Sequence, residues 1–384
     1  MIRAASSTKS SELHTICCDE GGVTANVRAG VRGRVTNFWQ RVSEGRTIDG
    51  LWKQFAADAR AGYGFYGGDV GWEEIRKLPR WRRPLHVAKQ FFWALLLKMT
   101  AARRVLLLVG LVLLAARGFE WFAAFLFLML LLLELADKVT MKRDLEIARE
   151  IQSWLVPAHP PEVPGADIAF TTRPQNTVAG DYYDAFFPNA DADDKLMVVI
   201  ADVAGKSIPA ALLMATLQAS LRTIANEGAP LVDLVARLNR NACTHSQNGQ
   251  RFTTAVLSEY DPQRRRLTYV NAGHNAPILR RADGALEKLE TGGMPLGIHS
   301  SATYESACVE LQPGDALIFY TDGVVEAFDK QRQEFGNDRW CSVIRALPIL
   351  NAQESLRFLM QPVDEFVGVT PQSDDITYLV FRCK

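Results

Sequence analysis

Aspartates mark the ends of apolar segments in this 384-residue chain. The run Leu196 to Ala201 stops at a single acid, Asp202, and the run from Ala316 to Tyr320 leads into Thr321-Asp322-Gly. Such runs are typical of strands buried on both faces, and strand ends commonly present catalytic groups. The acids with this placement are Asp181, Asp202, Asp322 and the pair Asp374-Asp375. We expect them to share one site.

Carboxylates that lie within a few ångströms of one another cannot all stay ionised unless cations accompany them. Oxygen ligands select hard cations such as Mg²⁺ or Mn²⁺. No His-x-x-x-His or Cys-x-x-Cys pair accompanies the acids, which argues against zinc. Two hard cations can activate a water and steady both oxygens of an in-line phosphoryl displacement. The pattern therefore predicts hydrolysis of a phosphate ester.

Between about Leu145 and Arg382 the chain carries an ordered set of motifs. They are Leu145-Glu-Ile-Ala-Arg-Glu-Ile-Gln, Ala179-Gly-Asp-Tyr-Tyr-Asp, Ala201-Asp-Val-Ala-Gly-Lys, Pro209-Ala-Ala-Leu-Leu-Met-Ala, Asn271-Ala-Gly-His-Asn-Ala-Pro, Pro295-Leu-Gly, Pro313-Gly-Asp, Tyr320-Thr-Asp-Gly-Val-Val-Glu-Ala and Asp374-Asp-Ile-Thr. This set resembles the SpoIIE/RsbU-type branch of the PPM (PP2C-like) metal-dependent serine/threonine protein phosphatases. The resemblance implies an α+β fold with a PP2C-like αββα sandwich as the catalytic domain.

The resemblance also assigns roles by motif position. The implied metal ligands are Asp181, Asp202, Asp322, Asp374 and the backbone carbonyl of Val203, which would hold two Mn²⁺ or Mg²⁺ ions; Asp202 and Asp322 are the acids expected to be catalytic. Asp184, Lys206 and Asp375 are candidates for orienting a metal-bound water or binding phosphate.

Three positions depart from the family pattern. The PP2C branch has a histidine as a proton donor where this chain has Ala204, and Ala179 and Ser207 stand where glycine is more common. His274 lies in a motif that is typical of a strand-end turn, which favours a structural role over that of a general acid.

The resemblance implies a protein phosphatase that hydrolyses phosphoserine or phosphothreonine on a signalling partner, such as an anti-sigma-factor antagonist, by a dimetal-activated water; the apolar segment described below would make it membrane-tethered. One alternative is a catalytically silent PPM-fold module that binds a partner. Another is a membrane-tethered nucleotide cyclase, which an acidic motif after a linker helix would suit. That alternative leaves the Thr321-Asp-Gly and Asp374-Asp-Ile-Thr motifs unexplained.

Composition sets further bounds. With 43 acidic and 43 basic residues, the chain has no net charge and gives no signal for nucleic acid binding. The six cysteines form no metal-spaced or disulfide-like framework, as expected for reduced cytosolic thiols. No cleavable signal peptide is visible. Residues 1–90 read as a partly disordered cytoplasmic region of unknown role.

Residues 91–136 read as a membrane-associated segment with two short apolar helices, about 104–117 and 120–136. Basic residues flank the pair on both sides, whereas only Arg117 lies between the helices, so both ends are expected to face the cytoplasm. A helical hairpin buried in a core or a dimer is one alternative. A single long span is another, but it would have to hide Arg117 and Glu120 near its middle.

Residues 137–156 read as a helical signalling linker, and 157–384 as the phosphatase domain. Leu145, Ala148, Ile151 and Leu155 form one apolar stripe, and Pro157 ends the helix. The stripe packs either on the helix's own domain or on a second copy. We favour pairing with a second copy as a homodimer, which would transmit a signal to the active site.

Overall fold

The computed structural model describes residue 79 and residues 82–188, 195–246 and 249–384. Most of the predicted N-terminal region, 1–90, lies outside these residues. Contacts divide the chain into two compact units, Met1–Glu134 and Leu135–Lys384, which are considered separately.

The first unit contains helix α4 (Arg83–Lys98), helix α5 (Ala101–Ala115) and the beginning of helix α6 (Glu120–Leu155). Arg104 joins α4 to α5, because its guanidinium donates to the carbonyl oxygens of Leu97 (2.6 Å) and Met99 (2.9 Å). These carbonyls lie at the end of α4, where the helix itself supplies no partner.

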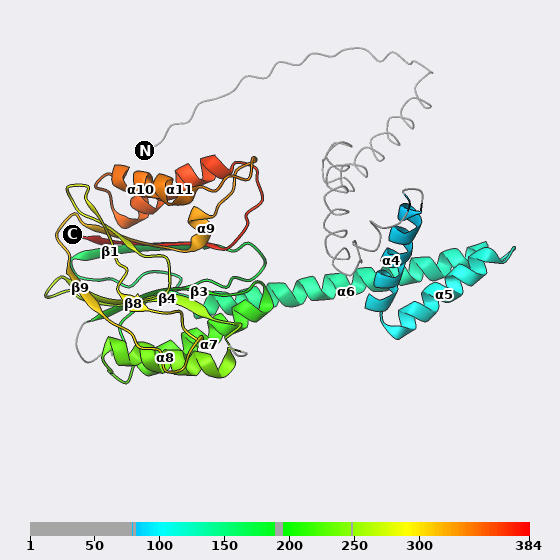
Figure 1. Cartoon of the computed structure of the whole chain (residues 1–384), viewed down its shortest axis with the longest axis horizontal. Helices are drawn as coiled ribbons and strands as arrows, with labels where there is room; N and C mark the ends of the chain where they lie inside the picture. Colours follow the sequence, from blue (N-terminus) through cyan, green and yellow to red (C-terminus); the bar gives the residue numbers. More distant parts are fainter. Residues whose placement is uncertain (1–78, 80–81, 189–194, 247–248) are drawn as a thin grey trace, which may run out of the picture. The chain divides into compact units, whose positions relative to one another are not determined.

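Helices α5 and α6 form an antiparallel hairpin (Figure 1). Gly110 is buried against the ring of Phe127, and Arg103 pairs with Glu134 at 3.0 Å, so both contacts fit one register. Gly118, with φ +89°, makes the turn. The structure thus contains two helices joined near Gly118, at 101–115 and from 120 onward, close to the predicted 104–117 and 120–136.

Helix α6 continues through the predicted linker, 137–156, as far as Leu155, since no glycine or proline interrupts its 36 residues. By length and hydropathy, one helix within the described ranges qualifies as a candidate membrane span, Ile208–Ala225. That helix, α7, packs on a sheet of the second unit.

The second unit is built from two mostly antiparallel sheets. The first sheet has the order β1-β11-β10-β6-β7: Ala166–Arg173, Ile376–Cys383, Ala316–Tyr320, Ile278–Arg280 and Leu286–Lys288. The second sheet has the order β2-β3-β4-β5-β8, with β9 also paired to β5: Tyr182–Phe186, Leu196–Val203, Thr253–Asp261, Arg266–Ala272, Gly292–Gly293 and Ala307–Glu310.

Helices cover both outer faces. Helices α7 (Ile208–Ala225) and α8 (Leu231–His245) pack on the second sheet; α9 (Asp322–Val325), α10 (Gly336–Ala346) and α11 (Ala352–Val367) pack on the first. A third apolar layer, which includes Val198, Leu267 and Phe319, fills the space between the sheets. The expected αββα sandwich is therefore present (Figure 1).

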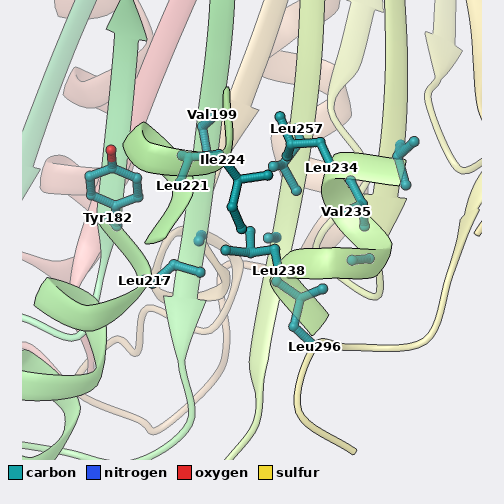
Figure 2. Packing of buried hydrophobic residues seen from close by; sticks show 14 of the residues in the cluster. Tyr182, Val199, Leu217, Leu221, Ile224, Leu234, Val235, Leu238, Leu257 and Leu296 are labelled. Carbon is teal, nitrogen blue, oxygen red and sulfur yellow. The ribbon is translucent and has the colours of Figure 1, made fainter. Parts of the chain in front are cut away.

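The layer under α7 and α8 shows why these segments are helices. Leu217, Leu221 and Ile224 recur at four- and three-residue spacing and belong to one buried cluster with Val199 of β3 (Figure 2). Leu234 and Leu238 of α8 belong to the same cluster, as does Leu257 of β4. This packing holds the C-terminal end of β3, which carries Asp202, in a fixed place.

Candidate active site

The predicted acids meet at one end of the sandwich. Asp202 lies near the end of β3, and its neighbour Asp181 immediately precedes the paired strand β2. In the other sheet, Asp322 follows β10 and the pair Asp374-Asp375 precedes β11, which is paired with β10. Antiparallel pairing brings two acids together within each sheet, and the packing of the two sheets brings together acids that lie more than 190 residues apart in sequence.

Asp181 is the most deeply enclosed of these acids. Its side chain is buried, and its Oδ2 accepts hydrogen bonds from the hydroxyls of Thr321 (3.0 Å) and Thr377 (2.5 Å). Burial and the charge of Asp202 raise the pKa of the Asp181 carboxyl, against the effect of the two hydroxyls.

Asp202 is central to the cluster. Burial, followed by the charges of Asp322 and Asp374, raises the pKa of Asp202 to about 7, and its carboxyl lies within hydrogen-bonding range of Asp181. The pKa of Asp322 is also raised, by burial and by Asp374, while Lys206 acts in the opposite direction. These four aspartates therefore form one electrostatic unit.

The two adjacent acids of the C-terminal motif have different environments. Asp375 accepts from the backbone N–H of Gln175 and of Gly180, each at 2.6 Å, so it holds the loop that leads to Asp181. Burial raises the pKa of Asp375. Asp374 is more exposed, and its Oδ2 lies 3.1 Å from Lys206 Nζ. Of the pair, Asp374 has the carboxylate that is better placed to bind a ligand.

Lys206 lies at the rim of the cluster. Besides its ion pair with Asp374, its ammonium donates to the carbonyl oxygen of Ser373 at 2.9 Å. The loop that carries it is unusual, since Ser207 has φ +66° and ψ −146°. This conformation suits glycine and costs a serine on the order of 1–3 kcal/mol. The glycine more common at this position would avoid that strain.

Asp184 does not join the cluster. It is fully buried and accepts from Tyr182 Oη at 2.6 Å and from the Arg222 guanidinium at 2.9 Å on each oxygen. Arg222 belongs to α7, so this ion pair ties the helix to the outer face of the second sheet. Burial raises the pKa of Asp184, and its two partners oppose that shift.

His274 is a buried side chain near the cluster. Its Nδ1 lies 2.8 Å from the Thr254 hydroxyl, and its backbone N–H donates to Asn271 Oδ1. Burial lowers the pKa of His274 to about 4, which leaves the ring neutral near pH 7. These contacts are those of a residue that supports the turn between β5 and β6.

The chemistry of the donor set fits a hard cation. All candidate ligand atoms are oxygens, and a bound cation would offset both causes that raise the pKa of Asp202, its burial and the charges of the neighbouring acids. Across the described ranges, no three His, Cys, Asp or Glu side chains are already gathered in the arrangement of a metal cage. Asp374, which is turned toward Lys206, is one side chain that would have to move.

Gln152, Thr321 and Thr377 also reach the site, although the sequence interpretation gave none of them a role. Gln152, on α6, donates from Nε2 to the Ala179 carbonyl (2.7 Å) and accepts from the Ala179 N–H (3.0 Å). The sequence did offer one indication that these three residues belong to the site, because each lies inside one of the quoted motifs.

Solved structures define the class. The SiaA-PP2C domain of Pseudomonas aeruginosa has a TM-score of 0.56 and 22% identity, covering 65% of this chain and 99% of that one. The PP2C phosphatase domain of SpoIIE from Bacillus subtilis has a TM-score of 0.50 and 22% identity, covering 56% and 63%. The fold is therefore that of PP2C-like phosphatases, which generally depend on Mn²⁺ or Mg²⁺.

The sequence defines the family. Residues 192–384 match the family described as Stage II sporulation protein E (SpoIIE), and the chain belongs to this family. Protein IcfG of Synechocystis sp. is 27% identical over 276 residues, which cover 65% of this chain and 43% of that protein. Phosphoserine phosphatase RsbU of Bacillus subtilis is 29% identical over 187 residues, covering 48% and 54%. The chain thus spans about half the length of these relatives.

Proposed function

We propose that this protein is a metal-dependent phosphatase that removes phosphate from phosphoserine or phosphothreonine on a signalling protein. One observation carries the proposal: Asp181, Asp202, Asp322 and Asp374, from both sheets, form one electrostatic unit at one end of the sandwich. Such a unit is suited to binding divalent cations beside a phosphate ester.

In this proposal the four aspartates and the Val203 carbonyl bind two Mn²⁺ or Mg²⁺ ions. When bound, the ions supply an activated water and offset the charge that develops on the phosphoryl group. Asp202 and Asp322 position this centre, and Asp375 keeps the loop before Asp181 in place through its two backbone hydrogen bonds. Lys206, at the rim, provides a cation for the phosphate once it leaves Asp374.

The substrate is proposed to be a phosphorylated protein of a partner-switching pathway, such as an anti-sigma-factor antagonist. Support comes from two Bacillus subtilis relatives, RsbU and RsbP, both of which are named phosphoserine phosphatases. RsbP is 27% identical over 192 residues.

Two further features belong to the proposal. Residues 91–136 would tether the protein to a membrane, with the phosphatase domain in the cytoplasm. Residues 137–156 would pair with a second copy, since Ile147, Ile151 and Trp154 of α6 are exposed at the four- and three-residue spacing of a coiled-coil seam.

Phosphate release tests the proposed activity. Full-length protein in detergent is assayed with Mn²⁺ on an aryl phosphate and on a phosphoserine protein, beside Asp202→Asn and Asp322→Asn. Asp283→Asn, at an exposed turn, is the matched control. We expect Mn²⁺-dependent release that both cluster variants lose by at least 100-fold and the control retains. Bound Mn²⁺ without any release would instead support the catalytically silent partner-binding module.

A further inference from the structure

Two buried threonine hydroxyls converge on one oxygen of Asp181. Thr321 Oγ1 lies 3.0 Å and Thr377 Oγ1 2.5 Å from Asp181 Oδ2, and neither threonine has any exposed surface. Thr321 follows β10, and Thr377 lies on the neighbouring strand β11, so both hydroxyls come from the sheet opposite to that of Asp181. The contact therefore joins the two sheets at the acidic cluster.

The hydrogen-bond partners of each threonine hydroxyl indicate whether it donates to Asp181 or accepts. Thr321 Oγ1 accepts the backbone N–H of Thr377 at 3.0 Å and has one proton to donate, for which Asp181 Oδ2 at 3.0 Å is a nearer acceptor than the Asp375 carbonyl oxygen at 3.4 Å. Thr377 Oγ1 has one proton and lies near both Asp181 and the Thr172 hydroxyl, at 2.8 Å. A carboxylate that binds a cation is ionised and only accepts, so in that state Thr377 donates to Asp181 and its oxygen accepts from Thr172. Both donors thus occupy Oδ2.

We infer that Thr321 and Thr377 are positioning residues for the divalent cation. By holding Oδ2, they fix the plane of the carboxylate and leave Oδ1 as the oxygen through which Asp181 binds an ion beside Asp202. Hydrogen-bond partners of metal-binding carboxylates typically contribute about 10- to 100-fold to metal affinity or activity. The inference rests on the proposed metal dependence.

Metal affinity provides the test. Full-length Thr321→Val and Thr377→Val remove a hydroxyl with little change in shape. Thr377→Ser keeps the hydroxyl. Thr268→Val, near the beginning of β5, is the matched control. Mn²⁺ binding is measured by calorimetric titration, and thermal unfolding is followed with and without EDTA. We expect each cluster valine to raise the Mn²⁺ Kd by about 10- to 100-fold, and the serine and control variants to stay within about threefold of wild type.

A purely structural role gives a different pattern. It would lower the unfolding temperature in EDTA while leaving the Mn²⁺ Kd of the valine variants near that of wild type, and that result overturns the inference. A serine variant as weak as the valine variant overturns it too. If a valine variant does not fold, Thr172→Val, which removes the donor to Thr377, must still raise the Mn²⁺ Kd by about 10-fold, well outside the threefold range of the controls. Wild-type protein that binds no Mn²⁺ would overturn both this inference and the proposed metal dependence, whereas unchanged variants overturn the positioning role alone.

Discussion

Asp202 is the residue at which the electrostatics of the cluster can be measured directly. Burial and the neighbouring acids raise its pKa to about 7, against an ordinary value of 3.8. Between these values the folded protein holds a proton that the unfolded chain releases. The stability of the metal-free protein therefore falls as the pH rises from about 4 to 7.

The variant Asp202→Asn removes this titration. In EDTA at pH 8 we expect it to be more stable than wild type by roughly 1–3 kcal/mol, with a flatter pH dependence between pH 4 and 7. Mn²⁺ should stabilise wild type but not the variant. Thermal unfolding across this pH range measures both effects, and parallel curves for the two proteins would contradict the prediction.

Arg222 is predicted to have a structural effect only. Arg222→Leu leaves the buried Asp184 carboxylate unpaired, which costs about 3 kcal/mol of folding stability. Arg237→Leu breaks a half-exposed ion pair with Glu227 and should cost below about 1 kcal/mol. Denaturant unfolding measures the difference. A large loss of Mn²⁺ affinity in folded Arg222→Leu would show that Asp184 acts on the metal centre after all.

The residue scale also shows what the sequence could predict. The four clustered aspartates were found because each lies where an apolar run begins or ends. Asp184 lies on β2, three residues after Asp181. Side chains alternate between the two faces of a strand, so this odd spacing predicts that Asp184 and Asp181 point to opposite faces of the sheet. Thr321 and Thr377 were marked only by their place in the motifs that contain Asp322 and Asp374, since threonine is common in strands for its β-propensity alone.

At the scale of elements, periodicity predicted much of the second unit. The apolar spacing within 209–225 and 231–243 is that of helices and matches α7 and α8, and the alternating segments 252–260 and 266–271 match the hairpin of β4 and β5. The strand order β1-β11-β10 could not be predicted from hydrophobic periodicity, because periodicity describes neighbouring residues whereas this order pairs Ala166 with Cys383. Only the family resemblance supplied the two-sheet arrangement.

Gln152 is the element-scale link between α6 and the site, since its amide bonds both backbone groups of Ala179. Gln152→Ala releases the segment that leads to Asp181. We expect phosphatase activity to fall about 5- to 30-fold, equivalent to the roughly 1–2 kcal/mol of two hydrogen bonds, with little change in unfolding temperature. Ser153→Ala, whose hydroxyl bonds only within the helix, is the matched control. Equal activity of the two variants would show that this contact does not couple helix and site.

At the scale of the whole molecule, one protein combines a strongly apolar hairpin with a PP2C-like sandwich. Side chains on α5 and α6 such as Val112, Trp121 and Leu131 are more than 60% exposed, although Gly110 and Ala123 are buried between helices. An apolar surface of this kind needs a cover, and the basic residues at both ends suit a lipid surface. At 15 residues, α5 is about 22 Å long, less than the roughly 30 Å of a hydrocarbon core.

The hairpin is therefore expected to insert from one side and hold the protein on a membrane. Full-length protein should float with phospholipid vesicles in a density gradient and stay with them in 1 M salt, which screens charge but not apolar insertion. Val112→Asp combined with Leu131→Asp should abolish flotation, since each charge costs about 2.5–3.5 kcal/mol in the apolar layer. Met141→Asp, at an equally exposed position on the linker, should float like wild type. Wild-type protein that stays out of the vesicle fraction would instead favour burial of the hairpin against a second copy.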